Sequence, residues 1–315
     1  MNYFNEKAWG GFIEFSSIAE RLACEYIERQ CGVKLIDAGV NVRGGFSAGL
    51  RMIELSTANL STASLVMAEL DGELWPHVEI RSDQPYWGCF ISQSGNRAIS
   101  VDETKTIYSG PACLLADREG FKETHDASDD SDCAVLIMEG DVLPDNTVCE
   151  ALADRCRVIP SHLGIVVAPT ASLAGVVQIA GRSVEATLQK LDILGIDPTM
   201  IRSAVGRCPA ASPGGDALQA LGRVNDVLVR GSQVWLAADG PGSIELLSML
   251  PEIIASTSRD YDRPFLEILA EAGQFFQIDK SYFGPAEISI VNLENGSSAH
   301  IGKRDESRLA TLVKL

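Results

Sequence analysis

The pattern of apolar and polar positions changes along the chain, and each change marks a different predicted structure. Residues 14–31 carry Ile18, Leu22 and Tyr26 at four-residue spacing, followed by a glycine, which predicts an amphipathic helix. From 33 to about 108 the apolar runs are short and are separated by glycine, proline, aspartate and serine. This second pattern predicts strands and turns.

Beyond 132, apolar runs alternate with helical segments. CAVLIME precedes the helical PDNTVCEALADRC, and LGIVVA precedes a long helix that extends to residue 191. This succession predicts parallel strands joined by right-handed βαβ crossovers. Farther on, RCPAASPGGD predicts a loop, and the next segment predicts a helix followed by a hairpin that turns at Gly231. Helices at about 243–250 and 264–272 and strands in EISIVNL and SSAHIG complete the prediction.

A polar and strongly acidic segment, 116–132, lies between the two patterns and predicts a surface linker at a domain crossing. The predicted fold class is α/β, with two α/β domains. Residues 1–115 together with 262–315 are expected to form a discontinuous first domain. The βαβα block at 116–261 is expected to form the second domain and to carry the long helix.

One face of this long helix carries polar groups. At about 100° per residue, Gly175, Gln178, Arg182 and Glu185 fall within about 80° of one another, and a separate apolar stripe faces the sheet. Ligands of α/β proteins bind beyond the carboxyl ends of the strands, so the polar face predicts a ligand site. The missing side chains of Gly175 and Gly181 would leave room for a flat molecule. The alternative is an ordinary ion pair between Arg182 and Glu185 on a wet surface.

Other polar residues stand at predicted strand ends and turns. Glu139 follows CAVLIM, Asp83 precedes a proline, Ser109 begins SGP, and the polar GRVND interrupts an apolar segment at 222–226. Each is a candidate ligand contact, and each is also typical of a turn or cap.

Composition narrows the classes of function. A formal charge of −17 argues against a nucleic acid or an anionic membrane as the main partner. It fits a protein that meets a cationic group, and equally one whose acidity serves solubility. The eight cysteines form no C-x-x-C pair and the four histidines no metal motif, which favours buried thiols and leaves open a metal site from distant ligands. No secretory signal pattern or bilayer-length apolar run is present, so a cytoplasmic location is expected.

Several stretches, taken in order, carry a resemblance along almost the whole chain. They are LIDAGV with GGFSAGL, SGPA, VLIMEGD with LPD, VAPTASLAGVVQIAGRSVE, GRVND, and DYDRPFLEI with FFQID and FGPAEI. Together they resemble the methenyltetrahydromethanopterin cyclohydrolase family, and the PTAS-x-x-G-x-VQI-x-x-R-x-x-E segment is the most specific part.

The resemblance implies two α/β domains with a large cleft between them, usually in a homotrimer. It implies hydrolysis of the cyclic amidinium of N5,N10-methenyl-tetrahydromethanopterin, or a dephospho or related form, to the N5-formyl compound, with no metal or redox cofactor. The family's catalytic pair falls on Arg182 and Glu185. Glu185 would act as general base and then acid, and Arg182 would orient the carboxylate and the water. The implied substrate contacts are Gln178, Glu139, Thr170, Ser172, Asp83, Ser109, Arg223, Asn225 and Asp226.

Departures from the family pattern leave a second hypothesis open. Ala58 and Asn59 stand where members usually have Gly-Gly, Cys113 where they usually have an arginine, and Asn96 where they usually have a tryptophan. These changes suggest a substrate with a shorter or less anionic tail. They also fit a pterin-binding paralogue that has lost turnover and acts as a carrier or assembly subunit. An unrelated α/β fold with an acidic surface is the third alternative.

Overall fold

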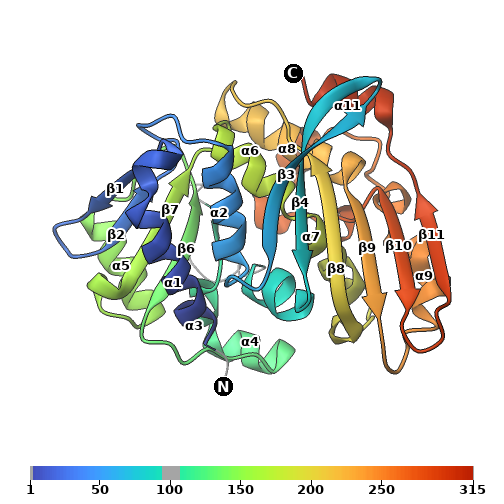
Figure 1. Ribbon diagram of the computed structural model, residues 1–315, viewed down its shortest axis with the longest axis horizontal. Helices are drawn as coiled ribbons and strands as arrows, with labels where there is room; N and C mark the ends of the chain where they lie inside the picture. Colours follow the sequence, from blue (N-terminus) through green and yellow to red (C-terminus); the bar gives the residue numbers. More distant parts are fainter. Residues whose placement is uncertain (1–2, 94–106, 315) are drawn as a thin grey trace.

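The computed structural model describes residues 3–93 and 107–314, and in this part of the chain two β-sheets lie side by side with helices packed on them (Figure 1). Asn96 lies outside the described residues. The predicted α/β class is confirmed. The large cleft stays a prediction.

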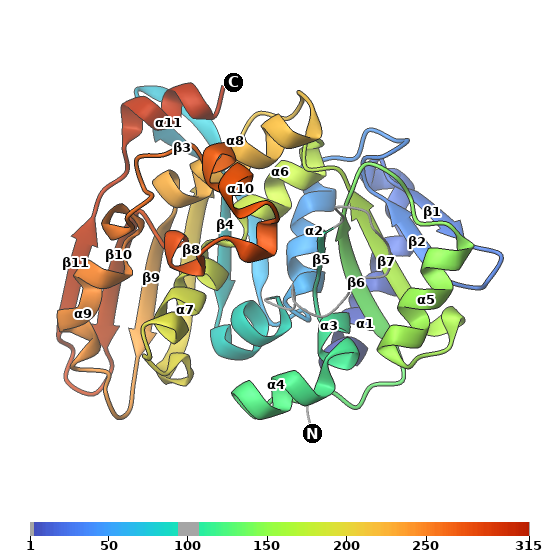
Figure 2. The same ribbon diagram turned by 180° about the vertical axis from the view of Figure 1, so that it is seen from behind.

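The first sheet has five strands in the order β1-β2-β7-β6-β5. Strands β2, β7 and β6 are parallel, and β1 and β5 are antiparallel edges. All six residues of β6 and of β7 are buried, because α1 and α2 cover one face while α3 and α5 cover the other (Figures 1 and 2). A continuous apolar run is expected for a strand buried on both faces. The bounds are β1 Glu25–Glu28, β2 Lys34–Asp37, β5 Ile107–Ser109, β6 Ala134–Glu139, β7 Leu163–Ala168, α1 Phe4–Ser17, α2 Phe46–Ser56, α3 Ala112–Ala116 and α5 Asn146–Cys156.

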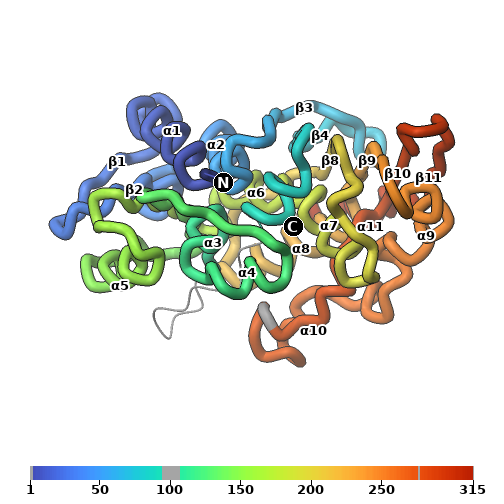
Figure 3. The backbone as a smooth tube through the Cα atoms, turned by 90° about the horizontal axis from the view of Figure 1, so that it is seen from below, coloured from blue at the N-terminus to red at the C-terminus, as the bar shows by residue number. Residues whose placement is uncertain are grey.

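The second sheet has six strands in the order β11-β10-β9-β8-β4-β3, and only β9 and β10 pair in parallel. Helices α7, α8 and α9 cover one of its faces, and α10 stands beyond α8 as a further layer (Figures 2 and 3). The alternating burial along β10 reflects this one-sided cover. The bounds are β3 Thr62–Leu70, β4 Glu73–Ser82, β8 Ile201–Pro209, β9 Gln233–Ala238, β10 Glu287–Asn292, β11 Ser298–Gly302, α7 Ser183–Ile193, α8 Ala217–Gly231, α9 Leu246–Ile253, α10 Phe265–Ala272 and α11 Glu306–Leu312.

Helix α6, Leu173–Ala180, connects the two sheets because it packs closely against α2 (Figure 1). Two glycines allow this approach. A Cβ on Gly49 would lie 2.6 Å from Val177 Cβ, and one on Gly181 would lie 2.4 Å from Ile53 Cδ1. The core cluster that includes Ile53 and Val177 continues to the strands of the second sheet, whereas the strands of the first sheet pack in two separate clusters.

The helix predicted over 14–31 is wrong. Helix α1 ends at Ser17, and Glu25–Glu28 is an edge strand. The buried face of α1 is made by Phe4, Ala8, Phe12 and Phe15, which lie mostly upstream of the predicted helix. Between them and the strand, Ala23 has a left-handed backbone with φ of 57°, which ends the helical turn.

Other predicted elements were partly wrong. The strand-rich segment 33–108 also contains α2 and a π-helix, Tyr86–Ser92, and the acidic segment 116–132 contains α4, Arg118–His125. The long helix is two helices, α6 and α7, separated at Gly181 and Arg182. There is no hairpin at Gly231, because α8 ends there and β9 runs parallel to β10. The strands and helices predicted at β6, α5, β7, α9, α10, β10 and β11 are confirmed.

The sheets also group the chain differently from the predicted domain division. Strands β1, β2 and β5 fall in the predicted first domain, yet they pair with β6 and β7 of the predicted second domain. Conversely, β3 and β4 share a sheet with β8 and β9. The polar segment at 116–132 contains a helix and a loop between β5 and β6 of one sheet, so it marks no crossing between sheets. Much of it is exposed, but Asp129 and Ser131 are buried.

Replacing Arg157 with glycine is expected to stabilise the fold by about 1 kcal/mol. This exposed residue follows the last turn of α5 with φ of 59°, where a Cβ is disfavoured. Urea unfolding measures the effect. Arg155→Gly is the matched control, because Arg155 lies inside α5 and glycine there costs about 1 kcal/mol. Shifts of the same sign in both variants would contradict this explanation.

Candidate active site

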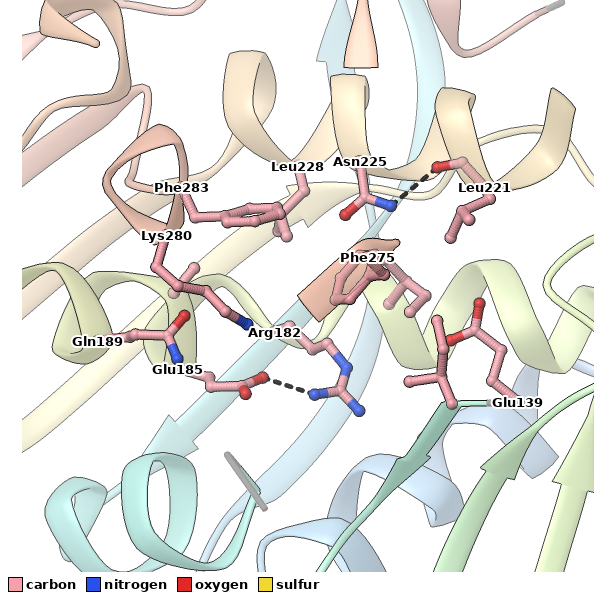
Figure 4. Close-up of a pocket in the computed structure, with 13 residues that line it drawn as sticks. Glu139, Arg182, Glu185, Gln189, Leu221, Asn225, Leu228, Phe275, Lys280 and Phe283 are labelled. Carbon is pink, nitrogen blue, oxygen red and sulfur yellow. Dashed lines mark hydrogen bonds and ion pairs between the residues drawn. The ribbon is translucent and has the colours of Figure 1, made fainter. Parts of the chain in front are cut away.

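A pocket of about 550 Å³, part of it open to solvent, lies where the end of the first sheet meets the helices of the second (Figure 4). Strands β5 and β6 line it on one side, and α6, α7, α8 and the segment 275–283 line the rest. Its lining residues are Ile107, Glu139, Ile179, Arg182, Glu185, Ala186, Gln189, Leu221, Asn225, Leu228, Phe275, Lys280 and Phe283.

Arg182 and Glu185 form an ion pair in this pocket, with 2.7 Å between Nη1 and Oε2 (Figure 4). Their side chains are 11% and 8% exposed, which excludes the wet surface pair. Arg182 is the residue before α7, just after the break from α6, and its Nη2 donates to Ser109 Oγ at 2.7 Å. Its Nε has no hydrogen-bond partner among the described residues. The guanidinium thus ties β5 to α7 and keeps one donor unsatisfied.

Glu139, at the end of β6, is held by two donors. The Thr170 hydroxyl donates to its Oε1, and Gln178 Nε2 donates to its Oε2 at 3.3 Å. Burial raises the pKa of the Glu139 carboxyl, and the hydrogen bond from Thr170 and the charge of Arg182 oppose this rise. Three of the predicted site residues therefore form one buried cluster.

Gly175 and Gly181 do not leave room for a ligand, and this part of the prediction is wrong. A Cβ on Gly175 would lie 2.0 Å from the carbonyl oxygen of Pro169, and Gly181 packs against Ile53. Both glycines permit close packing of the helices and the preceding loop. The space for a ligand lies on the side of Glu185 and Asn225 instead.

Of the remaining predicted contacts, only Asn225 lines the pocket. Asn225 lines it and donates through Nδ2 to the Leu221 carbonyl at 2.8 Å. Arg223 donates to the carbonyls of Ser212 and Gly214, and Asp226 accepts from the backbone N–H of Phe265. Ser172 caps α6, and the exposed Asp83 accepts from Ser203. These last four have local structural partners and do not line the pocket, so a contact of theirs with substrate stays a prediction.

Sequence reasoning missed several lining residues. If residues 178–189 are projected as the single helix predicted from sequence, Gln189 lies about 20° from Gln178. The polar face of that predicted helix therefore already included Gln189. Phe275, Phe283 and Lys280 come from the segment after α10, and the Lys280 Nζ lies 5.5 Å from the centre of the Phe275 ring. Their distance along the chain gave no signal that they meet α7.

Comparison with known proteins identifies the family. The profile described as Cyclohydrolase (MCH) matches residues 4–312. A protein named methenyltetrahydromethanopterin cyclohydrolase from Methanospirillum hungatei is 34% identical over 303 residues, which cover 95% of each chain. The chain belongs to the methenyltetrahydromethanopterin cyclohydrolase family. Relatives of the same name include one from Methanosphaerula palustris, 35% identical over 95% of this chain and 94% of its own. Another, from Rhodopirellula baltica, is 34% identical over 95% of this chain and 89% of its own.

The departures from the cyclohydrolase pattern can now be placed. Ala58 and Asn59 have φ of 54° and 55°, a conformation that glycine adopts without strain, and Asn59 Nδ2 donates to the Lys7 carbonyl at 2.6 Å. Cys113 is fully buried in the core of the first sheet. None of the three lines the pocket.

All eight cysteines are free thiols, seven of them buried, as predicted. No helix among the described residues is both long and apolar enough to span a bilayer, and no group of three or more potential metal ligands lies together there.

Proposed function

We propose that this protein hydrolyses the cyclic amidinium of N5,N10-methenyl-tetrahydromethanopterin, or of a dephospho or related form, to the N5-formyl compound. The enzyme class, a hydrolase of cyclic amidine C–N bonds, follows from family membership. The observation that carries the detailed proposal is the buried Arg182–Glu185 pair on the wall of this pocket.

The reaction needs a base and a proton donor. The carbon between N5 and N10 belongs to a cation and is already electrophilic. Water adds to it and loses one proton, giving a neutral hydroxyl adduct. N10 then accepts a proton, the C–N10 bond breaks, and the hydroxyl proton leaves to solvent. The net change is one water consumed and one proton released, with no change of oxidation state, so we propose no redox cofactor.

Glu185 is suited to both proton steps. It accepts the proton of the attacking water and returns it to N10 as the bond breaks. The ion pair with Arg182 occupies Oε2, and among the described residues Oε1 has no hydrogen-bond partner, so Oε1 faces the water in this proposal. A carboxylate also attracts the cationic substrate, in keeping with the overall negative charge.

Arg182 positions the base and the water. Its guanidinium is fixed from two sides by Glu185 and Ser109. A rigid donor at this position would orient the nucleophile without moving during the reaction. Glu139, Thr170, Gln178 and Asn225 would contact the substrate around it.

The purified protein is expected to remove the absorbance of methenyl-tetrahydromethanopterin and to release one proton per turnover. A stopped-flow record of the methenyl band with a pH indicator measures both. Decay at the uncatalysed rate, with the bound methenyl spectrum retained, would instead indicate the carrier function. The homotrimer and the cytoplasmic location stay predictions.

A further inference from the structure

The segment 261–283 supplies two aromatic side chains to the wall of the pocket. Phe275 and Phe283 both line the pocket, and their ring centres lie 6.2 Å apart. The ring of Phe265, at the start of α10, packs against both of them, with centres 6.1 Å from Phe275 and 6.2 Å from Phe283. Because the three rings are in contact, the placement of Phe265 influences where the two pocket rings lie.

Two charged side chains of α8 hold the start of this segment. Arg230 is fully buried, and its guanidinium lies 4.6 Å from the centre of the Tyr261 ring. Its Nη2 donates to the carbonyl oxygen of Tyr261 and, at 3.3 Å, to that of Arg263. One turn earlier on α8, Asp226 accepts from the backbone N–H of Phe265 at 3.2 Å. The residues just before α10 are therefore fixed to α8 through their backbone.

A second buried cation, Lys190 of α7, holds the other end of the segment. Its Nζ donates to the carbonyl oxygen of Ser281. Burial lowers the pKa of the Lys190 ammonium, and the charge of Asp279 opposes this change. The preceding residue on α7, Gln189, lines the pocket. Helices α7 and α8 thus each contribute side chains to the pocket and one buried cation that holds the backbone of the segment.

The stability of the fold gives little reason for a buried arginine here. Among the described residues, Nε and Nη1 of Arg230 have no hydrogen-bond partner, and Nε lies 3.9 Å from Asp226 Oδ1 in a loose ion pair. Replacing a buried ion pair with apolar side chains of similar volume is often neutral or stabilising. What an apolar side chain cannot supply is a donor that fixes backbone carbonyls at one place.

We propose that Arg230 and Lys190 are positioning residues for the reaction. Each fixes one end of the segment 261–283, and together they hold its two pocket rings at a set distance from the Arg182–Glu185 pair. A wall that is ordered before the substrate arrives loses less conformational entropy on binding, so it favours tighter binding. The inference rests on the proposed function, because it takes the occupant of the pocket to be the methenyl substrate.

Kinetics of Arg230→Met and Lys190→Met test the proposal, because methionine keeps much of the side-chain volume and removes the donor. Each variant should raise KM for the methenyl substrate about 3- to 10-fold, the effect of ordering a few side chains on binding. The change in kcat should stay within about twofold, because Arg182 and Glu185 are intact. Arg230→Lys keeps a donor and should restore most of the affinity.

Hydrogen exchange of the full-length protein measures the wall itself. In both methionine variants, the amides of 261–283 should exchange at least about 10-fold faster than in the wild type, since local opening is easier. Lys34→Met is the matched control. Lys34 Nζ also donates to a backbone carbonyl, that of Ser161 at 2.6 Å, and lies 5.6 Å from the centre of the Trp9 ring, but these residues do not line the pocket. The control should change neither KM nor exchange in 261–283.

The outcomes distinguish this inference from the proposed function. If the wild type hydrolyses the substrate and both methionine variants keep its KM, or if Lys34→Met raises KM equally, the inference alone fails. If the wild type binds the methenyl compound without turnover while the variants bind it more weakly and exchange faster in 261–283, the proposed function alone fails. Should Arg230→Met not fold, its combination with Asp226→Asn, which removes the unpaired carboxylate, is measured in its place with the same expected result.

Discussion

Replacing Glu185 with glutamine is expected to lower kcat by about 10²- to 10⁴-fold, the usual contribution of a positioned general acid–base group. The amide keeps the shape of the side chain and can still accept from Arg182, but it cannot take a proton from water. Substrate affinity should change far less, because the other residues that line the pocket are unchanged. Single-turnover decay of the methenyl absorbance measures the chemical step directly.

A control on the same helix distinguishes the loss of the base from the loss of one negative charge. Asp192→Asn removes one negative charge from an exposed position of α7 and should leave kcat near that of the wild type. The double variant Arg182→Gln with Glu185→Gln should be scarcely slower than Glu185→Gln, since residues that act as a unit are non-additive. A Glu185→Gln protein with a near-normal rate would exclude this residue as the base.

Replacing Gly175 with alanine is expected to destabilise the protein by about 3 kcal/mol or more, at or above the upper end of ordinary overpacking. The new Cβ would lie 2.0 Å from the Pro169 carbonyl oxygen and 2.9 Å from the Thr170 Cα. These are backbone atoms that cannot rotate away, so the loop before α6 must shift. Urea unfolding measures the loss of stability.

The control for this change is another helical glycine. Gly10 lies exposed within α1, and a Cβ there would meet no atom within 4 Å. Gly10→Ala should stabilise the protein by up to about 1 kcal/mol, because alanine favours the helix. If Gly175→Ala were as stable as the wild type, the close contact of α6 with its preceding loop would be contradicted.

Local sequence was enough to predict elements such as the strands whose residues are all buried. The runs at β6 and β7 are mostly apolar, and every residue in both strands is buried. Such a run predicts a strand buried on both faces without reference to other parts of the chain. Helix α5 has Asp145 as a cap that accepts from the Val148 N–H, so its start is also local. The 182 and 185 positions were already separated by one helical turn, which placed the pair on one face.

Tertiary structure decided the rest. The break between α6 and α7 depends on Gly181 packing against Ile53 of α2, a contact between residues far apart in the sequence. The assignment of strands to sheets depends on pairing between distant segments, which composition at 116–132 does not encode. Phe275 and Lys280 reach the pocket only because the segment after α10 folds back over α7 and α8. The sequence alone determined which residues could carry acid–base chemistry, and long-range packing decided which of them meet in one buried pocket.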